Sequence, residues 1–115
     1  IRKGKQPFIT GDGEQRRDML HVDDAVSANI FAMKYNNNFN GNAFDVGTGS
    51  NISLNEVKDI VNKYLPEIEF LYVDERPNDV MLTKADTIPM KNLGWQAEKD
   101  IVTGVQECFK RLAND

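Results

Sequence analysis

Arginines at two places in the chain could bind an anionic ligand. Arg16 and Arg17 follow a glycine-rich turn, and Arg76 opens a second polar loop much later in the chain. A guanidinium group is planar, and its donors form a fork that matches phosphate oxygens. Arginines from two separate loops could therefore clamp a diphosphate. Asp79, close to Arg76, could accept hydrogen bonds from sugar hydroxyls.

The alternative interpretation is that these arginines form ion pairs with nearby acids, such as Asp18 and Asp74. The spacing alone favours neither interpretation. The formal net charge of −4 does not exclude an anionic ligand, because the local field at a site matters more than the net charge.

Composition excludes several partners. The chain is mildly acidic, with 14 Lys and Arg against 18 Asp and Glu, so we expect no nucleic-acid partner. We expect no membrane partner either, because no apolar run approaches the roughly 20 residues that a membrane span needs. A single cysteine, Cys108, excludes an internal disulfide and fits a reducing compartment, which predicts a cytoplasmic protein.

Other chemistries find little support. One histidine and one cysteine cannot form a zinc site. The Gly47-Thr48-Gly49 turn begins like a dinucleotide fingerprint, but Ile52 stands where the third glycine belongs, which favours a simple tight turn. Aspartates flank His21, yet no partner nucleophile is evident, so a strand histidine with a satisfied hydrogen bond is favoured over a general base. We therefore expect no catalytic, cofactor-binding or metal-binding residue in this chain.

The first half of the chain predicts short elements around turns. Residues 8–10 and 19–22 are apolar runs on either side of a glycine turn, which suggests a loose hairpin or loop over 7–22. Asp23 or Asp24 is expected to cap a helix to about Tyr35, with one face carrying Val26, Ile30 and Met33. Residues 43–46 form a candidate strand.

The second half predicts three helices and one strand. Ser53 and Glu56 fit a capping box for a helix that stops before Pro66, and residues 69–73 predict a strand. Asp86 is expected to cap a short helix that ends at Gly94. A last amphipathic helix is predicted by the spacing of Ile101, Val105, Cys108, Phe109 and Leu112. The predicted class is α/β, a small mixed lobe of short strands and three to four helices.

Four motifs together resemble a known family. Gly11–Ala25 is similar to the GDGxxxRDxxxVDDxA segment of the extended short-chain dehydrogenases/reductases, the NAD-dependent sugar-nucleotide epimerases and dehydratases such as UDP-glucose 4-epimerase. Residues 44–49 resemble its N-[VIL]-G-[TS]-G turn, with Asp45 in place of Asn. Residues 75–80 resemble its R-x-G-D loop, with Asn78 in place of Gly, and residues 85–95 resemble its "AD…LGW" stretch.

The resemblance implies that residues 1–115 are the C-terminal, nucleotide-sugar-binding lobe of such an enzyme. The family's NAD fingerprint, catalytic Ser/Thr and Tyr-x-x-x-Lys pair lie in a preceding Rossmann part. Here no tyrosine has a lysine four residues later. Residues 1–7 read like the end of a helix, which favours a preceding part over a short disordered leader. NAD is thus implied for a complete enzyme, and this chain alone is expected to be inactive.

Site residues also follow from the resemblance. Arg17 and Arg76 match the family's diphosphate arginines, and Asp79 matches the acid at the nucleotide ribose. Residues that match the base-pocket segment are Phe8, Ile9 and Thr10. Thr83 falls near the position bordering the sugar ring, where a small side chain leaves room for an N-acetylhexosamine.

The implied partners are a nucleotide-diphosphate sugar and either the missing Rossmann half or a second copy of the chain, through an exposed apolar face. The alternative function is a stand-alone nucleotide- or protein-binding module without catalytic activity. The base, the sugar and the reaction subtype stay open.

Overall fold

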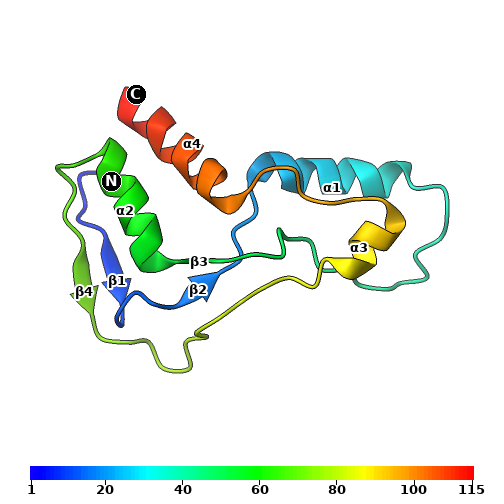
Figure 1. Cartoon of the computed structure of the whole chain (residues 1–115), viewed down its shortest axis with the longest axis horizontal. Coiled ribbons are helices and arrows are strands. Elements are labelled where there is room, and N and C mark those ends of the chain that lie inside the picture. The colour runs from blue at the N-terminus through cyan, green and yellow to red at the C-terminus, as the bar shows by residue number, and fades with distance from the viewer.

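The computed structural model describes residues 1–115 as an α/β chain with four helices and four short strands (Figure 1). The elements in chain order are β1 (Phe8–Thr10), β2 (Arg16–Arg17), α1 (Val22–Lys34), β3 (Ile52–Ser53), α2 (Leu54–Tyr64), β4 (Leu71–Val73), α3 (Ile88–Leu93) and α4 (Ile101–Asn114). None of the helices combines the length and apolar character needed to cross a membrane. The predicted fold class is confirmed.

The strands pair over long distances in the sequence. β1 runs parallel to β4, with Ile9 opposite Tyr72, and β2 runs antiparallel to β3, with Arg17 opposite Ile52. Of the two alternatives predicted for 7–22, the hairpin is wrong, because neither strand in that range pairs with the other, and the segment is a loop that carries β1 and β2. The strand predicted at 69–73 is confirmed as β4, although it is shorter.

Helix α1 begins differently from the prediction. His21 is its N-cap residue, and His21 Nδ1 accepts a hydrogen bond from the Asp23 amide at 3.1 Å. His21 is therefore not a strand residue, and neither aspartate is the cap. Asp24 is buried, and its carboxylate accepts hydrogen bonds from the backbone amides of Glu98 and Lys99, at 3.1 and 3.0 Å. This contact ties the start of α1 to the segment before α4.

The other helices follow local signals closely. The capping box at Ser53 and Glu56 is present, and α2 ends before Pro66 with Val61 buried beneath it. α3 ends at Gly94 as predicted, with a left-handed φ of 111°, although its N-cap is Thr87 and not Asp86. α4 is confirmed, but Cys108 on its predicted inner face is exposed.

The strand predicted at 43–46 does not form. This segment is an irregular connection between α1 and β3, and no other strand lies beside it to complete a hydrogen-bonded ladder. A β-strand is stable only with a paired neighbour. The short apolar run is thus present in the sequence, but it has no partner strand in the structure.

The molecule is thin and open. Its extents are 50 × 35 × 21 Å, and its radius of gyration is 16.7 Å, against about 13 Å for a compact domain of this length. Its surface of 8015 Å² exceeds by about a quarter the value of about 6,300 Å² expected from its mass. A small core joins Ala28 of α1, Met90 of α3 and Trp95. Little of the apolar surface is therefore buried within the chain itself.

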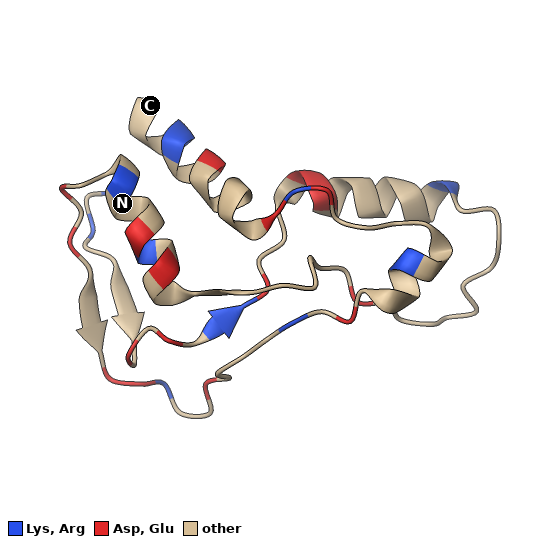
Figure 2. Cartoon of the chain, in the orientation of Figure 1, with Lys and Arg blue, Asp and Glu red and all other residues tan.

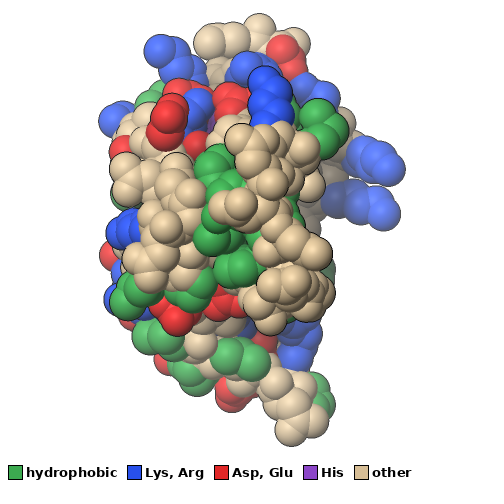
Figure 3. All heavy atoms as spheres, turned by 90° about the vertical axis from the view of Figure 1, so that its right-hand side faces the viewer, with side chains coloured by type: hydrophobic (Ala, Val, Ile, Leu, Met, Phe, Trp, Pro, Cys, Tyr) green, Lys and Arg blue, Asp and Glu red, His purple; other side chains and the backbone are tan.

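Part of the uncovered apolar surface lies on α1. The face of α1 predicted to be apolar carries Val26, Ile30 and Met33, which are 51%, 43% and 78% exposed. Figure 3 views the end of the molecule formed by α1, α3 and the loop between α1 and β3, and apolar side chains form a strip down that end. The prediction of one apolar face is correct, but nothing in this chain covers it.

Candidate functional site

Three of the predicted site residues meet at one carboxylate oxygen. Arg17 Nη2 lies 2.9 Å from Asp79 Oδ1, and Arg76 Nη2 lies 3.3 Å from the same oxygen. Arg17 comes from β2, whereas Arg76 and Asp79 come from the loop between β4 and α3 (Figures 1 and 2). The fold thus brings together the two arginine sites that the sequence separates.

The alternative interpretation is correct in that all three arginines form ion pairs with acids of the chain, but the acids expected for it are wrong. Neither Asp18 nor Asp74 forms an ion pair with an arginine in the structure. The Asp79 side chain is 8% exposed and the Arg17 side chain 24% exposed, whereas that of Arg76 is 68% exposed. The site therefore has a sheltered half at Arg17 and Asp79 and an open half at Arg76.

Local backbone geometry sets the loop that carries Arg76 and Asp79. Asn78 adopts a left-handed conformation with φ of 60°, which asparagine tolerates better than most residues. The Asp79 amide donates to the Arg76 carbonyl at 3.3 Å and closes a tight turn. This turn points both side chains toward β2.

The glycine turn before β2 has a steric requirement. Gly13 has a φ of 80°, and a Cβ there would lie 2.1 Å from Asn55 Oδ1. The Asn55 side chain donates to the Asp12 carbonyl at 3.0 Å and so holds the turn against the start of α2. The positive φ and this close approach both favour glycine at position 13.

Arg16 has a structural role and does not face the site. Its Nε donates to Asn51 Oδ1 at 2.8 Å, and its Nη2 lies 3.4 Å from Glu56 Oε2. The Ser53 backbone amide, with Arg16 as a smaller contribution, holds the pKa of Glu56 below its usual value. Of the two adjacent arginines, only Arg17 contacts Asp79.

Asp18 joins the segment beside the site to two other loops, a role that its residue type and spacing did not predict. Its carboxylate accepts hydrogen bonds from the Thr48 hydroxyl at 2.6 Å and from the amides of Thr48, Gly49 and Ala85 at 3.0, 2.9 and 3.1 Å. Partial burial raises the pKa of Asp18, but these bonds outweigh it and lower the pKa overall. The signal in the sequence was its place in the R-D pair of the Gly11–Ala25 motif, directly after Arg17.

Thr83 lies against β2 and is fully engaged there. Its amide donates to the Arg16 carbonyl at 3.0 Å, and its hydroxyl accepts from the Asp18 amide at 3.1 Å. These bonds hold the second loop alongside β2. The small Thr83 side chain is half-buried, and its hydroxyl already has a protein partner.

A small polar hollow of about 180 Å³ adjoins the arginine site. Its lining residues are Thr10, Gly11, Asp12, Gln15, Glu75, Asp79 and Met81. Of the predicted base-pocket residues, Thr10 thus lines the hollow, and Phe8 is 63% exposed on the same strand. Ile9 is 4% exposed, so its side chain belongs to the core.

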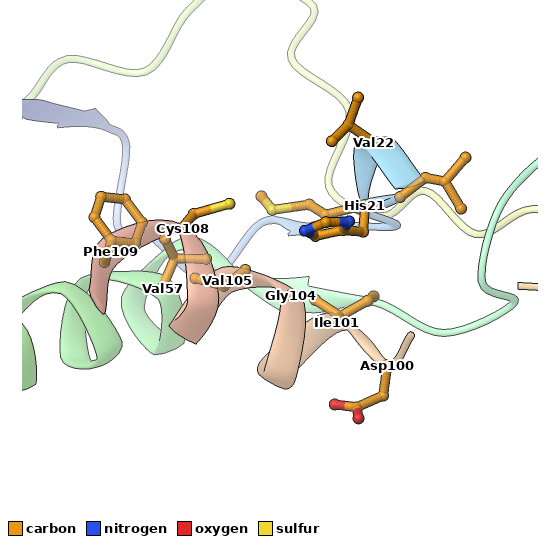
Figure 4. Close-up of a pocket in the computed structure, with 11 residues that line it drawn as sticks. His21, Val22, Val57, Asp100, Ile101, Gly104, Val105, Cys108 and Phe109 are labelled. Atoms are coloured by element: carbon orange, nitrogen blue, oxygen red, sulfur yellow. The ribbon is translucent and has the colours of Figure 1, made fainter. Parts of the chain in front are cut away.

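A larger apolar pocket of about 430 Å³ lies away from the arginines, between the segment before α1 and helices α2 and α4. Figure 4 shows His21 and Val22 on one side of it and Val105, Cys108 and Phe109 of α4 on another. The Nδ1 atom of His21 caps α1, and the Nε2 atom of His21 lies 3.6 Å from Glu107 Oε2. No group of three or more potential metal ligands occurs in the structure.

The Gly47-Thr48-Gly49 turn does not fit a dinucleotide. A Cβ on Gly47 would lie 2.5 Å from the Ala85 side chain, and one on Gly49 would lie 2.8 Å from Thr87. The space that these glycines provide is thus filled by the chain itself.

Comparison with known proteins gives this geometry a context. Residues 1–47 match the model of the NAD dependent epimerase/dehydratase family. Over 114 residues, which are 98% of the chain and 36% of the relative, the sequence is 31% identical to a putative UDP-glucose 4-epimerase of Methanocaldococcus jannaschii. The chain is homologous to the C-terminal part of NAD-dependent epimerases and dehydratases.

Solved structures agree with this relationship. The structure of UDP-glucose 4-epimerase from Thermotoga maritima with UDP-glucose matches with a TM-score of 0.79 and 28% identity, covering 98% of this chain and 37% of that one. MoeE5 in complex with UDP-glucuronic acid and NAD matches with a TM-score of 0.77 and 32% identity, covering 96% and 38%. The chain spans about a third of the length of these relatives. The resemblance inferred from the four motifs is confirmed.

Proposed function

We propose that residues 1–115 form the nucleotide-sugar-binding lobe of an NAD-dependent sugar-nucleotide epimerase or dehydratase. In this proposal, Arg17 and Arg76 bind the diphosphate, and Asp79 accepts a hydrogen bond from the ribose. The observation that carries the proposal is the convergence of both guanidinium groups on Asp79, at 2.9 and 3.3 Å, beside a polar hollow.

The chemistry of the site suits such a ligand. Two guanidinium groups and the Asp79 carboxylate leave one positive charge where they meet. The adjoining hollow is lined by the acids Asp12, Glu75 and Asp79 and by one apolar residue, Met81. A charge-assisted hydrogen bond contributes about 1.5–3 kcal/mol, and the exposed Arg76 less because solvent screens it. Arg17 is thus expected to contribute more of the affinity than Arg76.

The proposed role in catalysis is to position the substrate. Binding energy from a remote nucleotide handle holds the sugar in place for reaction. The family's hydride transfer between a sugar carbon and NAD would take place on residues outside this chain. We propose that the exposed apolar surface of α1 packs against that NAD-binding part, or against a second copy of the chain when the part is absent.

A binding experiment tests the proposal. Isothermal titration calorimetry with UDP is expected to show binding to the wild type, weakened about 10-fold or more in Arg17→Gln and less in Arg76→Gln. Arg111→Gln is the matched control, because Arg111 lies on α4, away from the site. Equal UDP affinities for the wild type and Arg17→Gln would contradict the proposal.

The alternative function, a stand-alone module that binds nucleotides or proteins, differs in its partner. It predicts UDP or protein binding without any NAD-dependent activity, even when a complete NAD-binding part is supplied. Activity restored by co-expression with the first two-thirds of a relative would exclude this alternative.

A further inference from the structure

The two arginines share a single atom of their counter-ion. Both guanidinium groups reach Asp79 Oδ1, and Asp79 Oδ2 accepts no hydrogen bond from the protein. The Asp79 side chain is only 8% exposed, and it lines the polar hollow beside Thr10 and Gln15. One carboxylate oxygen therefore occupies the place between two guanidinium groups that a phosphate oxygen of the proposed ligand would take.

The two arginines are held with different strength. Arg17 Nη1 also donates to the Arg16 carbonyl at 2.8 Å, so its guanidinium keeps one anchor even without Asp79. Arg76 has no other side-chain partner than Asp79, at 3.3 Å, and its side chain is 68% exposed. An exposed ion pair of this kind contributes little to stability. Arg76 can exchange its partner at low cost, whereas Arg17 keeps its position.

The local charges allow such an exchange. Asp79 neutralises part of the positive charge of the pair, and a diphosphate carries more negative charge than one carboxylate. A ligand anion between the arginines would also lie close to Asp79 and be repelled by it unless that carboxylate turned toward the hollow. There Asp79 would meet a hydroxyl group instead of a guanidinium group.

We propose that Asp79 is the resident counter-ion of Arg17 and Arg76, and that the diphosphate binds by displacing its Oδ1 atom from them. This inference rests on the proposed function, because it describes how that site is occupied before the ligand arrives. Asp79 thereby acts as an internal competitor for anions, a role distinct from any bond to the ribose. An anion without a hydroxyl partner for Asp79 therefore binds more weakly than a ligand that supplies both a diphosphate and a hydroxyl group.

Inorganic pyrophosphate separates this role from ribose binding, because it has no ribose. In calorimetric titrations of the whole 115-residue chain, Asp79→Asn is expected to bind pyrophosphate about threefold or more tightly than the wild type. Glu75→Gln is the matched control, because Glu75 lines the same hollow without contacting either arginine. A gain in Asp79→Asn no larger than that in Glu75→Gln, or a loss of affinity, would overturn the proposal.

UDP titrated in parallel distinguishes this inference from the proposed function. Wild-type protein that binds no UDP contradicts the proposed function, while the pyrophosphate comparison still decides the role of Asp79. If Asp79→Asn does not fold, side-chain NMR of the wild type gives the answer. Pyrophosphate is expected to shift the signals of both guanidinium groups and of the Asp79 carboxyl carbon together. A carboxyl signal that stays unchanged while the arginine signals move would overturn the proposal.

Discussion

Arg17 Nη2 donates a 2.9 Å hydrogen bond to Asp79 Oδ1, although the two residues are 62 positions apart in the sequence. The bond joins β2 to the loop after β4, and both of its members are sheltered from solvent. A small, open chain with few buried residues thus orders two charged groups at one point. In the proposed function, a phosphate oxygen takes the place beside Arg17 that Asp79 Oδ1 occupies in this contact.

The first prediction concerns Asp18. Asp18→Asn is expected to lower the free energy of unfolding by about 3 kcal/mol. The two oxygens of the carboxylate accept hydrogen bonds from four donors, whereas an amide has a single acceptor oxygen. Chemical denaturation followed by circular dichroism measures this. Asp59→Asn, on the exposed side of α2, is the control and is expected to change the stability by less than about 0.5 kcal/mol.

Asp18 also predicts a pH dependence. Its pKa is lowered in the folded chain, so its ionised form stabilises the fold above the unfolded value of 3.8. That stabilisation is expected to disappear as the pH falls below this value and toward the folded pKa. In Asp18→Asn, the loss of stability on acidification should be smaller than in the wild type. An identical acid profile for both proteins would count against the assigned hydrogen bonds.

The glycine turn gives a steric prediction. Gly13→Ala is expected to destabilise the chain by about 2 kcal/mol or more, because it combines a positive φ with a collision against Asn55. Gly41→Ala is the matched control: Gly41 has a φ of 73°, but nothing lies within 4 Å of its added Cβ. The difference between the two melting temperatures isolates the collision. Equal effects would show that Asn55 can move aside freely.

The exposed face of α1 predicts association. The chain is expected to self-associate with rising concentration, and Met33→Lys combined with Val26→Lys should shift the equilibrium toward monomer. Sedimentation velocity measures this distribution. Val102→Lys changes an exposed apolar residue on α4 and serves as the control. A wild-type chain that stays strictly monomeric at high concentration argues against a docking role for this face.

Because the turn at 47–49 does not fit a dinucleotide, the isolated chain is predicted to be inactive. Mixed with NAD and a UDP-sugar, residues 1–115 alone should give no NADH and no altered sugar. Spectrophotometry at the NADH absorption band and chromatography of the sugar nucleotide measure both. Turnover above the no-protein control would contradict the prediction that this chain binds the substrate without catalysing its reaction.

Local signals in the sequence were sufficient where the structure is local. The capping box of Ser53 and Glu56, the Gly94 helix end and the period of α4 depend on residues within a few positions of one another. Arg17, Arg76 and Asp79 were found through motif resemblance, and the structure brings them together. That agreement extends to the left-handed Asn78, which stands in a glycine position of the motif.

Long-range features were not predictable in the same way. The parallel pairing of Ile9 with Tyr72 and the four bonds of Asp18 join segments whose proximity no periodicity encodes. The His21 cap was missed because the adjacent aspartates are better caps by propensity, and tertiary contacts claim Asp24 instead. The strand predicted at 43–46 failed for the opposite reason, since its local pattern is present without a partner.

The most direct test of the central claim is an amide NMR titration of the folded protein with UDP. The account predicts saturable shifts at Arg17, Arg76 and Asp79, with the Trp95 indole signal in the distant core unchanged. Shifts that spare these three residues while UDP binds elsewhere, or no binding by the folded protein at all, would contradict it.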